Sequence, residues 1–388
     1  MKLDSQAAMQ VLVFCLVGSS FTVVYITQPV LPILEAEFGV DARVASLSVS
    51  AVIFGIALAN LPFGILADRY KITSIILVGG SVVAASSLVC AATDHFPTLA
   101  AARFVQGLFI PSLTTCIAAY LARSLPSHRL NVVMGSYVAA TVAGGMGGRL
   151  LGGWIHPPLH WRYAFASAAV LVVVATVAGY LWLPDEHEKP QKRLDESGFL
   201  VLLLRPELLR MFAVAFGAFF VFSSTFNYLP FYLATPPLSA RTEVITLMYL
   251  AYVVGIVIAP ISGKVSNQLG SGATMVLGSS IFALALSASL IPSLPVIATS
   301  LVGVCAGFFS IHSAAVGLLN RRLTVSRGRA NSLYVLCYYA GGGAGITVCG
   351  AVYASYGWTG TALLNAAMVL LPLAIGLKEI TQDRRGTA

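Results

Sequence analysis

The side chains that could do chemistry in this sequence are charged or hydrogen-bonding groups inside long apolar stretches. Arg149 lies in the glycine-rich run GGMGGRLLGGWI at positions 144–155, and Arg103 lies in LAAARFVQG at positions 99–107. A charged side chain near the centre of a bilayer costs about 2.5–3.5 kcal/mol on insertion scales, so such a residue normally faces protein or a water-filled cavity. His312, in CAGFFSIHSAAVG, adds an imidazole, the side chain best suited to gaining and losing a proton near neutral pH. These residue types favour movement of a proton or a polar substrate through a membrane.

The elements that must position these side chains are membrane-spanning helices. The chain has 388 residues, of which 57% are hydrophobic and 10% are charged, and its mean hydropathy is +0.85. A soluble domain carries about 25% charged residues, and a transmembrane helix needs about 20 mostly apolar ones. We predict twelve spans, near residues 10–34, 43–67, 72–92, 97–122, 130–155, 160–183, 208–233, 242–264, 272–291, 294–319, 330–354 and 358–377. The predicted fold class is an all-α membrane protein whose twelve transmembrane helices form two pseudo-symmetric six-helix bundles.

A polar stretch divides the chain into two halves. PDEHEKPQKRLDESG, at positions 184–198, separates six predicted spans from six. We predict an N-terminal six-helix bundle at 1–183, a cytoplasmic linker at 184–207 and a C-terminal six-helix bundle at 208–388. Residue types repeat between the halves at a nearly constant offset, as in the pairs Asn131 and Asn331, Gly145 and Gly345, and Gly64 and Gly263. Two such halves in the same orientation rock against each other around a central site.

The distribution of basic residues predicts the orientation of the spans. Because cytoplasmic loops are enriched in Lys and Arg, we place both termini in the cytoplasm, in a multi-pass protein of the bacterial inner membrane. Eighteen Lys and Arg then lie inside, and only Arg43, Arg162 and Arg241 lie outside. The net charge of +8 is explained by this topology, and we expect no nucleic-acid partner.

Several function classes are excluded because their motifs are missing. The sequence contains no H-E-x-x-H, no G-x-S-x-G and no G-x-x-x-x-G-K-[ST], which are typical of metalloproteases, serine hydrolases and P-loop ATPases. The six cysteines all fall in apolar runs, where cysteine is usually a packing residue. We therefore expect no enzymatic activity, no cofactor and no bound metal.

Three short stretches have spacings that suit moving helices. In GILADRYK, at positions 64–71, Gly64 permits close approach of a neighbouring backbone, and Asp68 can sit against the positive end of a helix. LAAARFVQG places Arg103 and Gln106 one turn apart in the fourth span. The fifth span carries Gly135, Gly144, Gly148, Gly152 and Gly153. Glycines at spacings of about four let helices approach closely in lipid.

Together these stretches resemble the major facilitator superfamily, in its branch of bacterial twelve-span efflux permeases that exchange drugs or small molecules for protons. The resemblance covers nearly all of the chain. GILADRYK is similar to the family's G-x-L-a-D-r-x-G-r-k, although Lys71 stands where the family has glycine. LAAARFVQG matches l-x-x-x-R-x-x-q-G. The fifth-span glycines match every glycine of the antiporter pattern G-x8-G-x3-G-P-x2-G-G, and Arg149 replaces its proline.

The resemblance implies which residues take part in conformational gating. The predicted gating residues are Gly64, Asp68, Arg69, Gly144, Gly148, Arg149 and Gly152. In the family the loop aspartate locks a contact between the halves, and its partner here would lie near Ala330 and Asn331. Two interpretations of Arg149 remain open. It either snorkels to the outer face or pairs with Glu35 or Glu37, or it lines the outer gate and meets a polar or anionic substrate.

The family arrangement also implies a central cavity lined by spans 1, 4, 7 and 10. The predicted substrate-binding residues are Tyr25, Gln28, Arg103, Gln106, Asn227, Tyr228, Tyr232, His312 and Tyr338. Aromatic rings with a few hydrogen-bonding groups form adaptable pockets for small organic molecules. The family implies proton coupling for Arg103, and we expect it for His312 as well. The alternatives are that Arg103 snorkels to the interface and that His312 is a packing residue.

No acidic residue lies in the middle of a predicted span. This absence favours a neutral, zwitterionic or weakly anionic substrate. We predict an alternating-access secondary transporter that exports small organic compounds by proton antiport. The alternative is a facilitator or proton symporter for a small organic anion. The expected partners are the small organic substrate, protons and the lipid bilayer, and we expect a monomer.

Overall fold

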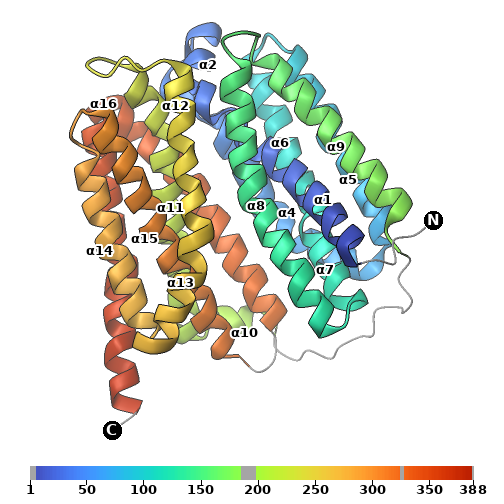
Figure 1. Cartoon of the computed structure of the whole chain (residues 1–388), viewed down its shortest axis with the longest axis vertical. Helices are drawn as coiled ribbons and strands as arrows, with labels where there is room; N and C mark the ends of the chain where they lie inside the picture. Colours follow the sequence, from blue (N-terminus) through green and yellow to red (C-terminus); the bar gives the residue numbers. More distant parts are fainter. Residues whose placement is uncertain (1–5, 185–197, 324–326, 387–388) are drawn as a thin grey trace. The chain divides into compact units, whose positions relative to one another are not determined.

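The computed structural model describes residues 6–184, 198–323 and 327–386, and all regular elements in these ranges are helical (Figure 1). Residues 185–197 of the predicted linker lie outside the described residues. The helices before the linker are α1 (Gln6–Tyr25), η1 (Gln28–Val30), α2 (Leu31–Phe38), α3 (Ala42–Ala45), α4 (Leu47–Arg69), α5 (Ile72–Ala92), α6 (Phe96–Leu113), α7 (Thr115–Ser124), α8 (Ser127–Ile155) and α9 (Arg162–Trp182). The helices after it are α10 (Phe199–Leu203), α11 (Pro206–Ala234), α12 (Thr242–Met248), η2 (Tyr249–Tyr252), α13 (Val253–Leu269), α14 (Ser271–Ala288), α15 (Leu294–Arg321) and α16 (Arg327–Gly386).

Ten helical segments of the described chain are long and apolar enough to cross a membrane. α8 is not among them, because its many glycines add length without apolar character. α16 has 60 residues, about 90 Å of helix, which is far longer than a hydrocarbon core of about 30 Å. Gly357 interrupts it with φ 59° and ψ −152°, a conformation that glycine adopts readily because it has no Cβ. If α8 is added and the two arms of α16 are counted as two spans, the ten segments become the twelve spans predicted. The predicted all-α membrane fold is confirmed.

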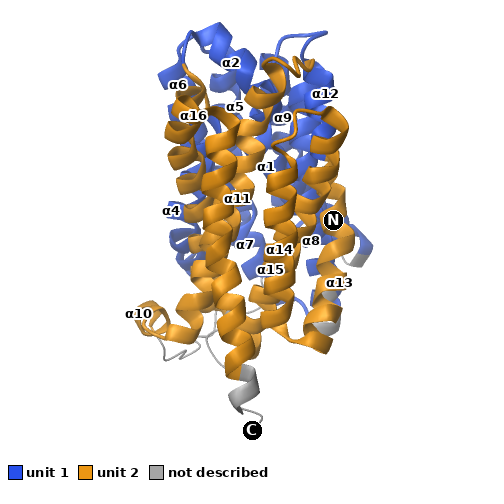
Figure 2. Cartoon of the chain, turned by 90° about the vertical axis from the view of Figure 1, so that its left-hand side faces the viewer, with its two compact units in different colours: residues 1–40, 47–193, 242–249 blue, residues 41–46, 194–241, 250–388 orange. Residues whose placement is uncertain are grey.

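The described chain forms two compact units (Figure 2). Unit 1 comprises residues 1–40, 47–193 and 242–249, and unit 2 comprises residues 41–46, 194–241 and 250–388. Each unit includes a short segment from the other half of the sequence. In unit 1, α12 packs on α8 and η1, and in unit 2, α3 packs on α16.

Glycines set the contact between α1 and α8 in unit 1. A Cβ at Gly144, Gly148 or Gly152 would overlap the carbonyl oxygen of Gly18, Thr22 or Ile26, respectively. Both rows advance by four residues, so the backbone of α8 touches α1 at Gly18 and Thr22 and then the residue that follows it, Ile26. This is the close packing that small residues provide in lipid, where helices gain little from burying apolar side chains.

Unit 2 repeats this arrangement between α11 and α16. There a Cβ at Gly341 or Gly345 would overlap the carbonyl oxygen of Phe216 or Phe220. The spacing of four recurs on both helices, so the duplicated sequence pattern corresponds to a duplicated backbone contact.

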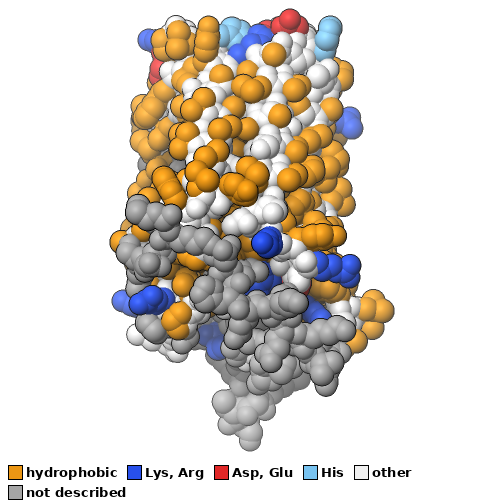
Figure 3. Space-filling model, turned by 90° about the vertical axis from the view of Figure 1, so that its right-hand side faces the viewer, with side chains coloured by type: hydrophobic (Ala, Val, Ile, Leu, Met, Phe, Trp, Pro, Cys, Tyr) orange, Lys and Arg blue, Asp and Glu red, His pale blue; other side chains and the backbone are white. Residues whose placement is uncertain are grey.

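The face shown in Figure 3 carries apolar side chains along most of its length. Lys and Arg gather toward its lower end, and acidic and histidine side chains are visible at its upper end. α9 contributes Val170, Val173, Val174 and Val177, each more than 40% exposed. An exposed apolar surface of this kind is expected of a helix that faces lipid.

The glycine row of α8 predicts that an added methyl group destabilises the protein at Gly148 but not at the neighbouring Gly147. In Gly148→Ala the added methyl meets the Thr22 carbonyl, and overpacking of this kind costs about 1–3 kcal/mol. Gly147→Ala places its methyl 4.0 Å from the nearest atom, Thr22 Oγ1, so it should be neutral or stabilising by up to about 1 kcal/mol. Thermal unfolding of purified protein in detergent should show a lower melting temperature for Gly148→Ala alone. Equal melting temperatures would contradict the close contact.

Candidate substrate and proton site

The first span is interrupted part-way along, and the interruption creates the candidate site in unit 1. α1 ends at Tyr25, and a turn at Ile26 and Thr27 leads into η1, which starts at Gln28. Pro29 and Pro32 follow, and proline removes the N–H that would bond to the carbonyl four residues earlier. Pro29 thus removes the donor for the Tyr25 carbonyl, and the other carbonyls of the last turn of α1 lack helical partners because the helix ends there.

Arg103 of α6 supplies donors to those carbonyls. Its Nη1 donates to the Val23 carbonyl at 2.7 Å, and its Nη2 donates to the Val24 carbonyl at 2.5 Å. Its Nε donates to the Ser48 carbonyl of α4 at 2.6 Å. The side chain is fully buried, and its Cζ lies 5.5 Å from the ring centroid of Phe165. Arg103 therefore does not snorkel to an interface; it fixes the broken end of α1 to α4 and α6.

Gln106 extends this network to α5. Its Oε1 accepts from Arg103 Nη1 at 2.7 Å, and its Nε2 donates to Ser87 Oγ at 2.8 Å. The sequence motif that joins Arg103 to Gln106 thus bridges four helices of unit 1. The predicted roles of both residues in substrate binding, and of Arg103 in proton coupling, stay predictions.

Arg149 of α8 lies at the same interruption and is only 2% exposed. Its Nε donates to Gln28 Oε1 at 2.7 Å, and its Nη1 donates to the Gly145 carbonyl at 2.7 Å. Its Cζ lies 3.9 Å from the ring centroid of Tyr25 and 5.3 Å from that of Tyr249. The expectation that Arg149 snorkels to the outer face is wrong, because the guanidinium is held inside unit 1.

The acid Glu37 is bound by other residues at one end of unit 1. Arg162 Nη1 donates to Glu37 Oε1 at 2.7 Å, and Trp161 Nε1 donates to Glu37 Oε2 at 2.5 Å. His160 Nε2 lies 3.4 Å from the same carboxylate. Beyond the end of α8, burial and the neighbouring His160 lower the pKa of His156, which favours the neutral imidazole. Glu37, suggested above as a partner of Arg149, therefore belongs to an ion-pair cluster with Arg162.

In unit 2 the predicted residues of α11 make separate contacts. Asn227 Nδ2 donates to Ser46 Oγ at 2.7 Å, and its buried Oδ1 has no hydrogen-bond partner among the described residues. Tyr228 donates to the Ile346 carbonyl at 2.8 Å. The ring of Tyr232 stacks on Trp358 with centroids 4.9 Å apart. These contacts connect α11 to α3 and α16.

His312 and Tyr338 lie in an aromatic cluster of unit 2. Tyr338 stacks on Phe219 with ring centroids 3.7 Å apart, and Phe308 stacks on His312 at 5.8 Å. His312 Nδ1 lies 3.0 Å from the hydroxyl of Tyr334. The structure thus brings these two predicted residues together on α15 and α16, and their roles in binding and coupling stay predictions.

The gating loop between α4 and α5 has a partner inside unit 1. Asp68 accepts from Arg123 Nη1 at 2.9 Å, and the Asp68 side chain is 68% exposed. Arg123 Nη2 also donates to the Ala67 carbonyl at 2.9 Å. Arg69 is exposed at the end of α4, and nothing lies within 4 Å of a Cβ built at Gly64. The described partner of Asp68 is therefore α7, and its predicted partner near Ala330 stays a prediction.

Two features of the site could not be found in the sequence. Tyr249 lies 100 positions from Arg149 and meets it only because α12 packs on α8. Glu379 is fully buried near the end of α16, where it accepts from Arg210 Nε at 2.7 Å and pairs with Arg322. No spacing rule links Glu379 to Arg210 and Arg322, since Glu379 lies in α16, Arg210 lies in α11 and Arg322 directly follows α15.

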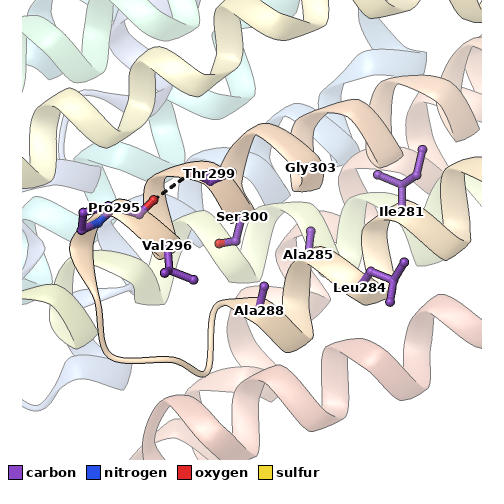
Figure 4. A pocket seen from close by; sticks show the side chains of 9 residues that line it. All are labelled: Ile281, Leu284, Ala285, Ala288, Pro295, Val296, Thr299, Ser300 and Gly303. Carbon is purple, nitrogen blue, oxygen red and sulfur yellow. Dashed lines mark hydrogen bonds between the residues drawn. The ribbon is translucent and has the colours of Figure 1, made fainter.

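An apolar cavity of about 540 Å³ lies between α14 and α15 (Figure 4). Its lining residues are Ile281, Leu284, Ala285, Ala288, Pro295, Val296, Thr299, Ser300 and Gly303. The Thr299 hydroxyl donates a hydrogen bond to the Pro295 carbonyl at 2.9 Å. None of the predicted substrate-binding residues lines this cavity, so it does not form the candidate site.

Comparison with known proteins decides the family. The Major Facilitator Superfamily model matches residues 13–318. The chain belongs to the major facilitator superfamily. It is therefore a multi-pass membrane transporter and not an enzyme, as the motif resemblance predicted.

Sequence relatives and solved structures agree with this assignment. The MFS-type transporter YybF of Bacillus subtilis (strain 168) is 28% identical over 364 residues, which are 92% of this chain and 89% of the relative. The inner membrane transport protein YnfM of Escherichia coli (strain K12) is 26% identical over 93% of this chain and 87% of the relative. A multidrug resistance protein B homolog of Mycobacterium tuberculosis (strain CDC 1551 / Oshkosh) is 29% identical over 43% of this chain and 31% of its own length. A bacterial homolog of the human lysosomal transporter Spinster, in an inward-facing and occupied conformation, has the same fold with a TM-score of 0.76, 14% identity and coverage of 98% of this chain and 96% of that one.

The contacts of Arg103 predict that lysine will not replace it. Lysine keeps the positive charge but lacks the planar fork that reaches several acceptors at once. Arg103→Lys should leave buried carbonyls of α1 or α4 without donors, at about 1–3 kcal/mol each. The measurement is thermal unfolding of Arg103→Lys and wild type in the same detergent. A wild-type melting temperature for Arg103→Lys would show that only the charge matters.

Proposed function

We propose that this protein exports small organic compounds across the inner membrane of a bacterium by alternating access, in exchange for protons. The main support is the contact between α1 and α8, because the glycines that make it follow the pattern that resembles the family's antiporters. The relative named as a multidrug resistance protein B homolog supports export as well. We place both termini in the cytoplasm and expect a monomer, since one chain supplies both halves that alternate.

The glycine row gives α1 and α8 a contact without interlocking side chains. Gly144, Gly148 and Gly152 bring backbone against backbone, so the helices can shift by a small amount without changing side-chain rotamers. Tyr25 is the last residue of α1 and Gln28 is the first of η1, so both would move with the broken end of α1. Arg103 keeps that end attached to α6, which is its contribution to coupling in this proposal.

We assign the proton-carrying step to His312 and its partner Tyr334. The hydroxyl of Tyr334 at 3.0 Å from Nδ1 fixes the orientation of the imidazole. The ring of Phe308 supports one face at 5.8 Å. A ring held in this way exchanges its proton through Nε2, and imidazole is the side chain whose charge changes most readily near neutral pH.

A second candidate function is uptake of a small organic anion by a facilitator or a proton symporter. The observation that favours it is the buried guanidinium of Arg149, which stands where the antiporter pattern has proline. Buried positive charge attracts anions and disfavours cations. The two functions differ in the direction of proton movement and in the charge of the compound.

Proton flux in proteoliposomes tests the proposed function. Vesicles containing pyranine would be mixed with ethidium, chloramphenicol or benzoate, as cationic, neutral and anionic probes. Wild type should give a compound-dependent proton signal, and His312→Ala should reduce it at least tenfold because the carrier is missing. Tyr334→Phe should reduce it less, since the imidazole remains. His95→Ala removes an exposed histidine and serves as the matched control with an unchanged signal.

Each other outcome has a definite meaning. Labelled benzoate that enters without counter-moving protons would support the second candidate. A wild-type signal in His312→Ala would refute the assigned carrier. Vesicles in which no probe moves and no proton signal appears would contradict the proposed export.

A further inference from the structure

The short helix α10 has an apolar face that points away from the rest of the protein. The side chain of Leu202 is fully buried, so it marks the side of α10 that faces the protein. Successive residues of a helix are turned by about 100°, which puts Leu200 and Leu204 on the side opposite Leu202. Leu200 is 69% exposed, Leu204 is 72% exposed and Val201 is 48% exposed. Three large apolar side chains are therefore uncovered on one short helix.

The neighbours of α10 place it at the end of the membrane-spanning region of unit 2. α10 packs on α11 and α16, and in Figure 2 it projects sideways from the lower end of unit 2. Both α11 and the part of α16 that starts at residue 328 belong to segments long and apolar enough to cross a membrane. Leu204 and Arg205 alone separate α10 from the start of α11. The ring centroid of Phe199 lies 5.8 Å from Cζ of Arg329, near the start of α16. α10 therefore lies where two spans begin.

A lipid surface is the partner that fits an apolar face in this position. A helix with leucines on one face lies in the membrane interface with that face among the acyl chains, and basic residues beside it strengthen the contact with anionic lipids. Arg205 directly follows Leu204 and is exposed. Its long side chain can lie along an apolar surface while the guanidinium reaches the headgroups. Leu209, near the start of α11, is 51% exposed, so exposed apolar side chains continue from α10 into the span.

We propose that α10 is an interfacial helix that inserts Leu200, Val201 and Leu204 into the cytoplasmic leaflet, where Arg205 binds the phosphate of an anionic phospholipid. Basic side chains close to an anionic membrane surface are attracted to it. The contact fixes the depth at which α11 enters the bilayer. The inference uses the orientation proposed above for the chain, and it does not depend on which compound is transported or on proton coupling.

Spin labels on the full chain in lipid vesicles test where α10 lies. The background is Cys15→Ser, which removes an exposed cysteine. The labelled variants are Leu200→Cys, Leu204→Cys and, as the matched control, Ser124→Cys at the exposed end of α7. Each nitroxide is tested for collision with oxygen, which concentrates in lipid, and with a neutral nickel chelate, which stays in water. The ratio of oxygen to nickel collisions should be at least threefold higher at positions 200 and 204 than at position 124.

A change of lipid tests the headgroup contact. Vesicles of phosphatidylcholine alone are compared with vesicles of phosphatidylcholine and phosphatidylglycerol in equal parts. The collision ratio at position 204 should rise at least twofold with the anionic lipid, because Arg205 then holds the helix closer to the headgroups. Adding Arg205→Gln should abolish this rise. Adding Lys71→Gln removes an exposed basic residue just before α5 and should leave the rise unchanged.

The other outcomes overturn the proposal. Equal collision ratios at positions 200, 204 and 124 would place α10 in water. Low collision rates with both reagents at positions 200 and 204 would mean that protein covers the face, either another segment of the chain or a second copy. The absence of a rise with phosphatidylglycerol, or a rise that survives Arg205→Gln, would refute the headgroup contact of Arg205.

Discussion

A helix that breaks inside a bilayer leaves carbonyl groups that only the protein can satisfy. Lipid offers no hydrogen-bond donors, so a spanning segment must satisfy its backbone internally. The first span of this transporter meets that constraint with Arg103, whose guanidinium binds two carbonyls at the end of α1 and one in α4. Everything else at the candidate site depends on this contact. It holds the residues just before Tyr25, and the chain then turns into η1, where Gln28 accepts from Arg149.

The two arginines therefore have different roles although both are buried positive charges. Arg103 donates to backbone carbonyls and to Gln106, so its guanidinium has a structural role. Arg149 contacts a side-chain amide that still has an unused donor, and two tyrosine rings lie near its guanidinium. A broken helix next to a buried charge is where transporters commonly bind polar substrates. The repeated glycine contacts of α1 with α8 and of α11 with α16 supply the same close packing in both units.

Much of the fold could be predicted from the sequence because apolar runs, basic residues and glycine spacing are local signals. Twelve spans, the all-α class and the helix contact at Gly144, Gly148 and Gly152 follow from such signals. Side-chain partners were harder to predict. Glu35 or Glu37 was suggested for Arg149 because both acids end the first span on its outer side, but Arg162 and Trp161 bind Glu37. Tyr249 could not be predicted as a neighbour of Arg149, since their contact depends on where α12 packs.

Hydrogen–deuterium exchange across residues 20–31 in nanodiscs tests the central claim most directly. The claim is that Arg103 holds the carbonyls at the broken end of α1, whereas Arg149 contacts side chains near that end and does not hold those carbonyls. Arg103→Lys should increase exchange of these amides at least tenfold, because the last turn of α1 loses its anchoring donors. Arg149→Lys should leave exchange in the absence of ligand close to that of wild type. Equal increases in both variants, or no increase in Arg103→Lys, would contradict this division of roles.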